Sequence, residues 1–266
     1  MKQNILSLLP PGKPWGELIH HYPTLESTNT LAKSLAAQGA PAGTVILADH
    51  QTGGRGRRGR SFHSPAGSGI YMSTILRPDC LPREIMHLTC AAAVSMCQAV
   101  ENAAGCRPGI KWTNDLVFGK RKIAGILTEL GFGSNGNVSY AVVGIGINCT
   151  QTSDDFPPEL RSIAGSLEMI TGQPIDRAAL AAAMILALEH MAATLFSEKE
   201  TIMDAYRSDC ITLGQQVSVV RADGNVRHGT ALDIDSDGAL IVEFSPGCTE
   251  TVSSGEVSVR GMYGYV

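Results

Sequence analysis

The chain has 266 residues, of which 44% are hydrophobic and 17% charged, and its formal net charge is −4. This composition is typical of a globular protein with a packed core, and the length allows one large domain or a larger and a smaller one. The slightly acidic balance excludes a protein that binds nucleic acid by bulk electrostatic attraction, so any anion binding must be local.

The cysteines and the N-terminal segment indicate a reduced, intracellular protein. The chain has 7 cysteines, which form no CxxC pair and no metal-ligand spacing with histidine. No apolar run has the length of a signal sequence or of a membrane span. We therefore expect a cytoplasmic protein with free thiols and no membrane partner.

A cluster of small polar side chains joins the first predicted strand, at residues 18–22, to a predicted helix at residues 31–38. The cluster contains Ser27, Thr28 and Asn29, and each of them can cap the helix. Capping needs only one such residue. The sequence therefore favours capping and ligand binding equally at this position.

A segment of glycines and arginines follows the next predicted strand, at residues 44–48. Gln51 and Gly53 precede four arginines that alternate with glycines over residues 54–60. Glycine lets backbone N–H groups approach a ligand, and guanidinium groups supply paired donors to carboxylate or phosphate. The glycine spacing also fits a dinucleotide-binding fingerprint, but the breaker-rich residues 61–69 oppose the helix that this motif requires. A phosphate cradle, a solvated basic loop and an unspecific nucleic-acid contact remain open for this segment alone.

The next predicted elements are mainly scaffold. A strand at residues 70–76 precedes a long helix, expected to begin at Pro82, to cover residues 83–104 and to end at Gly105. A later strand at residues 138–143 ends in Gly144–Asn148, where glycines permit either close packing or approach of a ligand. Helices are then predicted at residues 162–170, 176–196 and 198–208.

The clearest predicted hairpin pairs residues 110–118 with residues 122–129. Lys111 lies among its apolar residues, where a buried cation is costly unless an anion is near, although a lysine at a sheet edge can reach solvent. Asn114 and Asp115 are disfavoured in strands. The three residues together indicate a polar site on this hairpin.

The pattern changes near Leu213 to short alternating segments, which predict a small β-barrel. The expected domains are therefore residues 1–212 and 213–266. Turns are predicted at 223–224, 237–238 and 254–255, between strands at 216–220, 226–234, 239–244, 249–252 and 257–260.

Five separated motifs, read in order, resemble the biotin protein ligase family. They are STN at 27–29, Gln51 with GRGRRGR at 54–60, KWTNDL at 111–116, KIAGIL at 122–127 and GIGIN at 144–148. Segments 233–240 and 254–258 resemble the SH3-like domain of that family, so the likeness covers about residues 17–261. It implies an α+β fold, with a mixed-sheet biotin/lipoate ligase-like catalytic domain followed by a small SH3-like β-barrel.

The resemblance also implies a reaction in two steps that uses biotin, ATP and Mg²⁺. The biotin carboxylate attacks the α-phosphate of ATP, which gives biotinyl-5′-AMP and pyrophosphate. The ε-amine of one lysine on a biotin carboxyl carrier protein or domain then takes the biotin and releases AMP.

The resemblance implies catalytic roles for Lys111, Arg57 and Asp115. Lys111 would bridge the biotin carboxylate and the α-phosphate, and Arg57 would fold over the intermediate and hold its phosphate. Asn114 and Asp115 would orient Lys111 or hold Mg²⁺, and the metal ligands stay undefined. The expected binding residues are Ser27, Thr28, Asn29, Gln51, Gly53, Arg55, Gly56, Arg57, Lys111, Asn114, Lys122, Gly125 and Asn148.

Three residues depart from the family pattern. Thr113 replaces a usual proline, which can loosen a turn but leaves Lys111 in register. Phe62 stands near a usual tryptophan, and His63 stands where an aromatic residue is common. These two residues predict a weaker or rearranged surface for adenine stacking.

Two other functions compete with this one. A lipoate-type ligase shares the catalytic fold and a central lysine, but the arginine segment and the C-terminal barrel favour biotin. A binding module that grips single-stranded nucleic acid leaves Lys111 and the polar cluster at 27–29 unexplained. Because few residues precede the first motif, we expect a ligase without DNA binding. The sequence leaves a monomer and a homodimer equally open.

Overall fold

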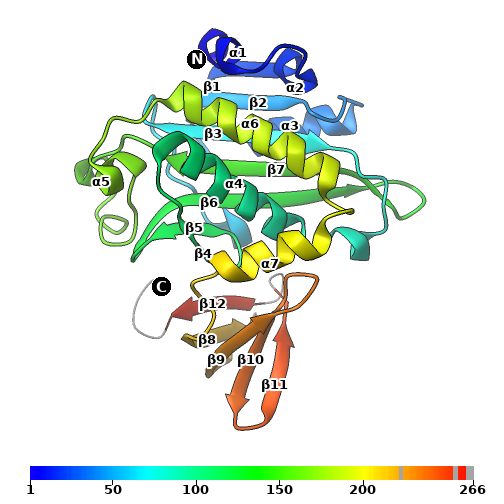
Figure 1. Cartoon of the computed structure of the whole chain (residues 1–266), viewed down its shortest axis with the longest axis vertical. Helices are drawn as coiled ribbons and strands as arrows, with labels where there is room; N and C mark the ends of the chain where they lie inside the picture. The colour runs from blue at the N-terminus through cyan, green and yellow to red at the C-terminus, as the bar shows by residue number, and fades with distance from the viewer. Residues whose placement is uncertain (222–223, 254–256, 262–266) are drawn as a thin grey trace.

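The computed structural model describes residues 1–221, 224–253 and 257–261, which contain two β-sheets (Figure 1). The larger sheet has seven strands in the order β1-β2-β3-β7-β6-β5-β4. Strands β1 and β2 are parallel, and the other neighbours are antiparallel. Their bounds are β1 Ile19–Leu25, β2 Val45–Gln51, β3 Gly69–Leu76, β4 Gly109–Lys111, β5 Asp115–Phe118, β6 Arg121–Phe132 and β7 Val138–Asn148. The predicted mixed sheet is thus confirmed.

Helices cover both faces of the larger sheet (Figure 1). They are α1 Lys2–Leu8, α2 Pro14–Glu17, α3 Thr28–Ala37, α4 Leu88–Ala104, α5 Leu167–Thr171, α6 Arg177–Thr194 and α7 Lys199–Asp209. Successive strand residues point to opposite faces. Val45 and Leu47 of β2 accordingly pack into the main core with α4 and α6, whereas Ile46 packs with Ala32 and Ala36 of α3. The sheet is therefore buried on both sides where the site is built.

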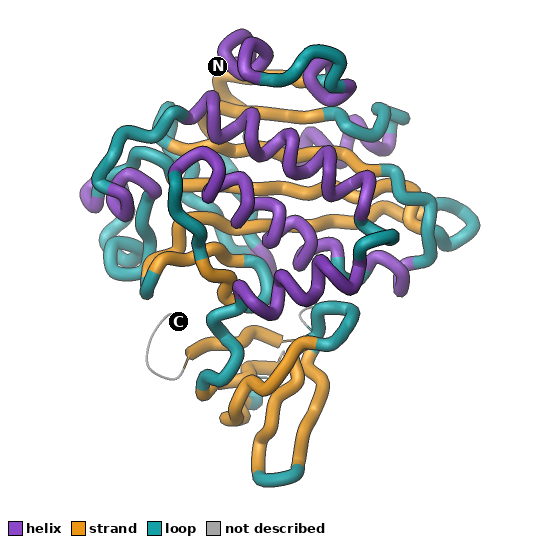
Figure 2. Tube along the Cα trace, viewed as in Figure 1, coloured by secondary structure: helices purple, strands orange, loops and turns teal. Residues whose placement is uncertain are grey.

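The C-terminal part of the chain forms a second, antiparallel sheet next to α7 (Figure 2). Its five strands have the order β11-β10-β9-β8-β12, with bounds β8 Gln216–Arg221, β9 Val226–Ile234, β10 Leu240–Ser245, β11 Cys248–Val252 and β12 Val257–Gly261. The expected fold class, a catalytic α+β domain followed by a small all-β domain, is confirmed. The boundary between residues 212 and 213 stays a prediction. The predicted turn at Ser254 and Gly255 lies outside the described residues, as does Asp223 of an earlier turn.

The helix predicted at residues 83–104 is broken near its start. Pro82–Ile85 form a 3₁₀ helix, and α4 begins only at Leu88. The break lies at His87, whose side chain is buried and whose Nε2 lies 2.8 Å from the carbonyl oxygen of Leu195. A buried polar contact to a distant segment therefore overrides the local helical pattern.

Three other predicted elements differ from the structure, and two helices were not predicted. The strand predicted at 110–118 is two strands, β4 and β5, because the chain turns at residues 112–114. Helix α3 begins at Thr28 rather than Leu31, since Ser27 is its N-cap. Helix α5 is shorter than predicted, because residues 161–163 form a turn. The sequence analysis missed α1 and α2, which are short and separated by prolines.

One helix in the described part of the chain, α6, is long and apolar enough to cross a membrane by length and composition alone. It packs against α4 and β3 and buries Leu180, Met184 and Leu188 in the main core. This placement is that of a core helix.

We expect His87 to make the fold sensitive to acid. Burial lowers the pKa of His87 from its ordinary value of 6.5, although the hydrogen bond to Leu195 opposes this shift. Below about pH 6.5 the unfolded chain therefore binds a proton that the folded chain does not. The free energy of unfolding should fall with decreasing pH in that range, by at most ~1.4 kcal/mol per pH unit from this group.

The variant His87→Gln can still donate a hydrogen bond to Leu195 but has no proton to take up. Its free energy of unfolding should fall less between about pH 7 and pH 5 than that of the wild type, as measured by urea denaturation at each pH. Equal decreases in the two proteins would show that His87 is not the responsible group.

Candidate functional site

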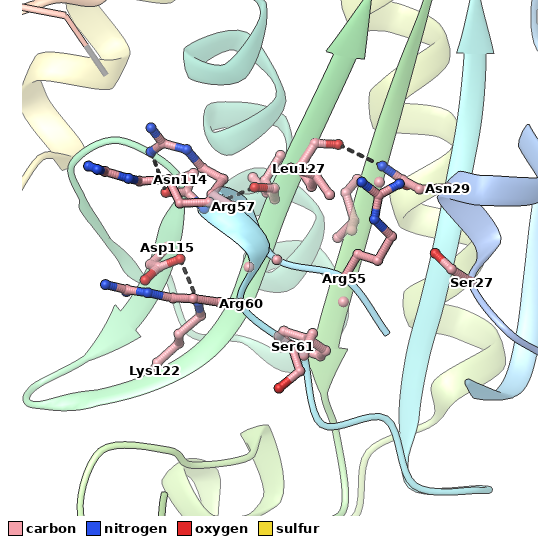
Figure 3. Close-up of a pocket in the computed structure, with 18 of the residues that line it drawn as sticks. Ser27, Asn29, Arg55, Arg57, Arg60, Ser61, Asn114, Asp115, Lys122 and Leu127 are labelled. Atoms are coloured by element: carbon pink, nitrogen blue, oxygen red, sulfur yellow. Dashed lines mark hydrogen bonds and ion pairs between the residues drawn. The ribbon is translucent and has the colours of Figure 1, made fainter. Parts of the chain in front are cut away.

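A cavity of about 340 Å³ lies where the arginine loop, residues 54–60, covers the larger sheet (Figure 3). All of the expected site residues line it except Gly53 and Asn148. Its walls come from the start of α3, the end of β2, the turn between β4 and β5, and strands β6 and β7. The topology therefore gathers into one cavity the motifs that are separated in the sequence.

One end of the cavity is a network of neutral polar side chains. Gln51 Oε1 accepts hydrogen bonds from the backbone N–H of Thr28 at 2.9 Å and from its hydroxyl at 3.1 Å. Gln51 Nε2 in turn donates to Ser64 Oγ at 2.9 Å. The buried Ser73 Oγ lies 2.8 Å from Thr28 Oγ1 and 2.6 Å from Asn29 Oδ1. These contacts fix the directions of donors and acceptors in the wall before any ligand arrives.

Two glycines of β7 make room for side chains of the site. A Cβ at Gly144 would lie 1.8 Å from Asn29 Oδ1, and a Cβ at Gly146 would lie 2.4 Å from Phe62 Cε1. Any other residue would therefore displace Asn29 or Phe62. Both glycines therefore permit close packing of site side chains against the strand, and because both also line the cavity, the approach of a ligand to them stays a prediction.

The other end of the cavity is charged. Lys111 ends β4 and Asp115 begins β5, on either side of the turn at residues 112–114. Asn114 Oδ1 accepts a hydrogen bond from Arg57 Nη1 at 2.9 Å, and Lys122 Nζ lies 2.6 Å from Asp115 Oδ1. Figure 3 shows Arg57, Asn114, Asp115 and Lys122 clustered at this end, with Ser27 and Asn29 at the other.

The charged end is strongly cationic in a protein whose net charge is −4. Among the lining residues, Asp115 is the only carboxylate, and the cations are Arg55, Arg57, Arg58, Arg60, Lys111 and Lys122. Of these cations, Arg55 lies near Asn29 at the other end and pairs with Glu129 (Figure 3). Burial lowers the pKa of the Arg57 guanidinium, and the charge of Asp115 opposes that shift. Because a guanidinium remains protonated in proteins, this end of the cavity has a positive potential suited to an anion.

The turn that follows Lys111 is held by groups from three other parts of the chain. Trp112 Nε1 donates to the carbonyl oxygen of Gly238 at 2.9 Å, and Trp112 N donates to Thr212 Oγ1 at 2.9 Å. Tyr206 of α7 donates to the carbonyl oxygen of Thr113 at 3.0 Å. The Trp112–Thr113 peptide bond is cis. Gly238 lies between β9 and β10, so the C-terminal domain contacts the turn that carries Lys111.

Two expected site residues lie outside the lining. Asn148 is buried and donates to the carbonyl oxygen of Gly165 at 2.9 Å, so it ties the end of β7 to a neighbouring loop. Gly53 donates its backbone N–H to the carbonyl oxygen of Glu26 at 2.8 Å. Both residues thus make hydrogen bonds that hold neighbouring segments of the fold together.

The sequence analysis missed two polar residues around the site, Ser73 and Glu129. Ser73 is fully buried within β3, and Glu129 of β6 hydrogen-bonds to Asn29 Nδ2 at 3.0 Å. A serine in an otherwise apolar strand was an available signal for the first. No local pattern indicates the second, because its partners are about a hundred residues away in the chain.

Two segments of the chain match known protein families. Residues 22–148 match the Biotin/lipoate A/B protein ligase family, and residues 212–260 match the Biotin protein ligase C terminal domain. The chain thus has the catalytic fold of the biotin and lipoate protein ligases and the C-terminal domain of the biotin protein ligases.

The individual proteins that the chain resembles are biotin ligases. The Bifunctional ligase/repressor BirA of Bacillus spizizenii is 38% identical over 90% of this chain and 73% of its own length. The Biotin--[acetyl-CoA-carboxylase] ligase of Mycobacterium tuberculosis is 32% identical over 87% of this chain and 85% of its own. The structure of the Aquifex aeolicus biotin protein ligase in complex with biotin and ATP superimposes with a TM-score of 0.78 at 26% identity, over 91% and 98% of the two chains.

The chain belongs to the biotin protein ligase family. It is an enzyme that activates biotin with ATP and transfers it to a carrier protein, and these findings favour biotin over the alternative substrate lipoate.

We expect the hydrogen bond from Trp112, which lines the cavity, to Gly238, which does not, to support catalysis. In Trp112→Phe the Gly238 carbonyl loses its donor in a buried position, so the free energy of unfolding should fall by about 1–3 kcal/mol. The adenylation rate should fall as well, because the turn carrying Lys111 loses one of its fixed points. Denaturant unfolding and single-turnover adenylation measure the two effects. Loss of stability with an unchanged adenylation rate would show that the contact serves only the fold.

Proposed function

We propose that the two ends of the cavity serve different parts of the ligase reaction. The neutral end, with Ser27, Thr28, Asn29 and Gln51, suits the ureido ring of biotin, which both donates and accepts hydrogen bonds. The cationic end suits the carboxylate of biotin and the α-phosphate of ATP. The observation that carries this proposal is the presence of both ends in one cavity of about 340 Å³.

In the first step, a carboxylate oxygen of biotin attacks the α-phosphorus of ATP. A new C–O–P bond forms, the bond between the α-phosphorus and the bridging oxygen breaks, and pyrophosphate leaves. Two anions must approach each other, so the main barrier that the protein can lower is electrostatic. Lys111 is the cation that we place between carboxylate and phosphate, and Lys122, held by Asp115, is a second one on the phosphate side.

In the second step, the ε-amine of the carrier lysine attacks the carbonyl carbon of the mixed anhydride. An amide bond forms, the C–O bond to the phosphate breaks, the amine loses a proton and AMP leaves. Arg57 holds the phosphate of the intermediate and, with the glycine-rich loop, keeps water from the anhydride until the carrier arrives. The hydrogen bond from Arg57 to Asn114 positions its guanidinium beside the cationic end.

Mg²⁺ is a further proposed participant. The described residues contain no cluster of three or more His, Cys, Asp or Glu side chains able to hold a metal. Mg²⁺ commonly binds through substrate phosphates, water and only one or two carboxylates, and Asp115 with Asn114 offers a donor set of this kind. The ion would neutralise phosphate charge during pyrophosphate release.

The acceptor is a biotin carrier of a carboxylase, and we propose the carrier of acetyl-CoA carboxylase, which the names of two relatives contain. A cytoplasmic location with seven free thiols, and a function without DNA or membrane binding, stay predictions, as does the choice between monomer and homodimer.

Lys111→Ala should reduce the formation of biotinyl-AMP by about a thousandfold or more, because the charge that brings the two anions together is lost. Pyrophosphate release from ATP and Mg²⁺, with biotin and lipoate supplied separately, measures the effect. Lys120→Ala is the matched control, because Lys120 is exposed and outside the cavity lining. Wild-type turnover in Lys111→Ala would overturn the assigned role, and dependence on lipoate would overturn the substrate.

Arg57→Ala should instead weaken the retention of biotinyl-AMP, with release faster by about tenfold or more, because a charge-assisted contact to its phosphate is lost. Released anhydride should then biotinylate unrelated lysines of an added bystander protein, detected by mass spectrometry. Labelling confined to the carrier lysine, as in the wild type, would contradict this role.

A further inference from the structure

Glu129 joins three side chains at the neutral end of the site. Its carboxylate accepts hydrogen bonds from Lys33 Nζ at 2.8 Å and from Asn29 Nδ2 at 3.0 Å, and Arg55 Nη1 lies 3.5 Å away. The side chain is 17% exposed and lies outside the cavity lining. Burial would raise the pKa of Glu129, but the hydrogen bonds from Lys33 and Asn29 and the charge of Arg55 together lower it. The carboxylate is therefore ionised at neutral pH.

The contact with Glu129 determines which way the Asn29 amide faces. An amide can be reversed end for end, and its partners decide between the two orientations. An ionised carboxylate only accepts hydrogen bonds, so it selects the Nδ2 end of Asn29, which also donates to the carbonyl oxygen of Leu127 at 3.3 Å (Figure 3). Oδ1 is then directed to Ser73. The Leu127 carbonyl selects the same orientation over a longer distance, so loss of the carboxylate removes the shorter, charge-assisted one of the two contacts that keep Oδ1 as the acceptor in the site.

The contact with Arg55 reaches the arginine loop. Arg55 is the first arginine of that loop, and it lines the cavity. Its ion pair with Glu129 fixes the start of the loop to β6, while the hydrogen bond between Arg57 and Asn114 fixes the middle of the loop near the cationic end. The pair with Arg55 is half-exposed, so its contribution is modest, yet it acts on the segment that covers the site.

We propose that Glu129 is a positioning residue that sets the orientation of Asn29 for biotin and, through Arg55, holds the arginine loop over the bound intermediate. Biotin affinity and retention of biotinyl-AMP are then linked through one carboxylate that touches neither substrate. This inference rests on the proposed binding of biotin at the neutral end.

Two variants of Glu129 separate its two contacts. Glu129→Gln retains an oxygen that can accept from Asn29 but removes the charge that pairs with Arg55. Glu129→Ala removes both the hydrogen-bond acceptor for Asn29 and the charge that pairs with Arg55. Lys33→Met is the matched control, because Lys33 also hydrogen-bonds to the Glu129 carboxylate but does not line the cavity.

The experiment measures biotin binding by calorimetry, ATP binding, the release rate of biotinyl-AMP and the melting temperature. We expect Glu129→Ala to weaken biotin binding by about tenfold and to speed release by about threefold or more, with ATP affinity unchanged. Glu129→Gln should change biotin binding by less than about threefold but speed release as Glu129→Ala does. Lys33→Met should leave both properties near wild type.

A double variant tests the coupling through the loop. If Arg55 and Glu129 act together, combining Glu129→Gln with Arg55→Met should speed release no more than Arg55→Met alone. Additive effects would overturn the proposed coupling. Wild-type biotin affinity in Glu129→Ala would overturn the role in orienting Asn29. Equal losses of biotin and ATP binding with a lowered melting temperature would assign Glu129 to the fold alone. Failure of the wild-type protein to form biotinyl-AMP would instead refute the proposed function.

Discussion

The site depends on how the turn after Lys111 is held. Residues 112–114 leave the sheet, so their backbone groups lack strand partners and must find others. Thr212 accepts from the Trp112 N–H, and Tyr206 of α7 donates to the Thr113 carbonyl. The C-terminal domain adds a side-chain contact, because the Gly238 carbonyl accepts from Trp112 Nε1. A lysine at the end of a strand that leads into an unsupported turn would sample many positions, and electrostatic stabilisation requires the charge in one place.

The same contacts explain why the two domains are not independent in this protein. Trp112 belongs to a hydrophobic core that also contains Val217, Ile234 and Leu240 of the C-terminal sheet. Beside it, a Cβ at Gly238 would lie 2.6 Å from Cys90 Sγ of α4, so the backbone of the β9–β10 loop sits directly on the catalytic domain. The smaller domain thus supports the turn that follows Lys111 without lining the cavity.

Local patterns in the sequence predicted the main strands and helices, whereas the fold class and the full set of site residues followed from the resemblance of five motifs to one family. Continuous apolar strands indicated a doubly covered sheet, and the polar residues at strand ends, such as Gln51 and Lys111, did gather in one cavity. Asn148 also lies at the end of a strand, but it does not line the cavity, and its amide donates to the carbonyl oxygen of Gly165. The turn at 112–114 and the role of Glu129 were not predictable, since both depend on partners far away in the sequence.

The departures from the family pattern have unequal consequences for the cavity. His63 is not among the lining residues, and its Nε2 lies 3.0 Å from the carbonyl oxygen of Asp155. Phe62 does line the cavity, and its ring packs on Gly146 with Lys122 Nζ 5.9 Å from the ring centroid. An aromatic face is therefore retained at Phe62, beside the cation Lys122. Because Gly146 has no side chain, the Phe62 ring lies directly against strand β7, so the absence of a Cβ on the strand sets the position of the aromatic wall of the cavity.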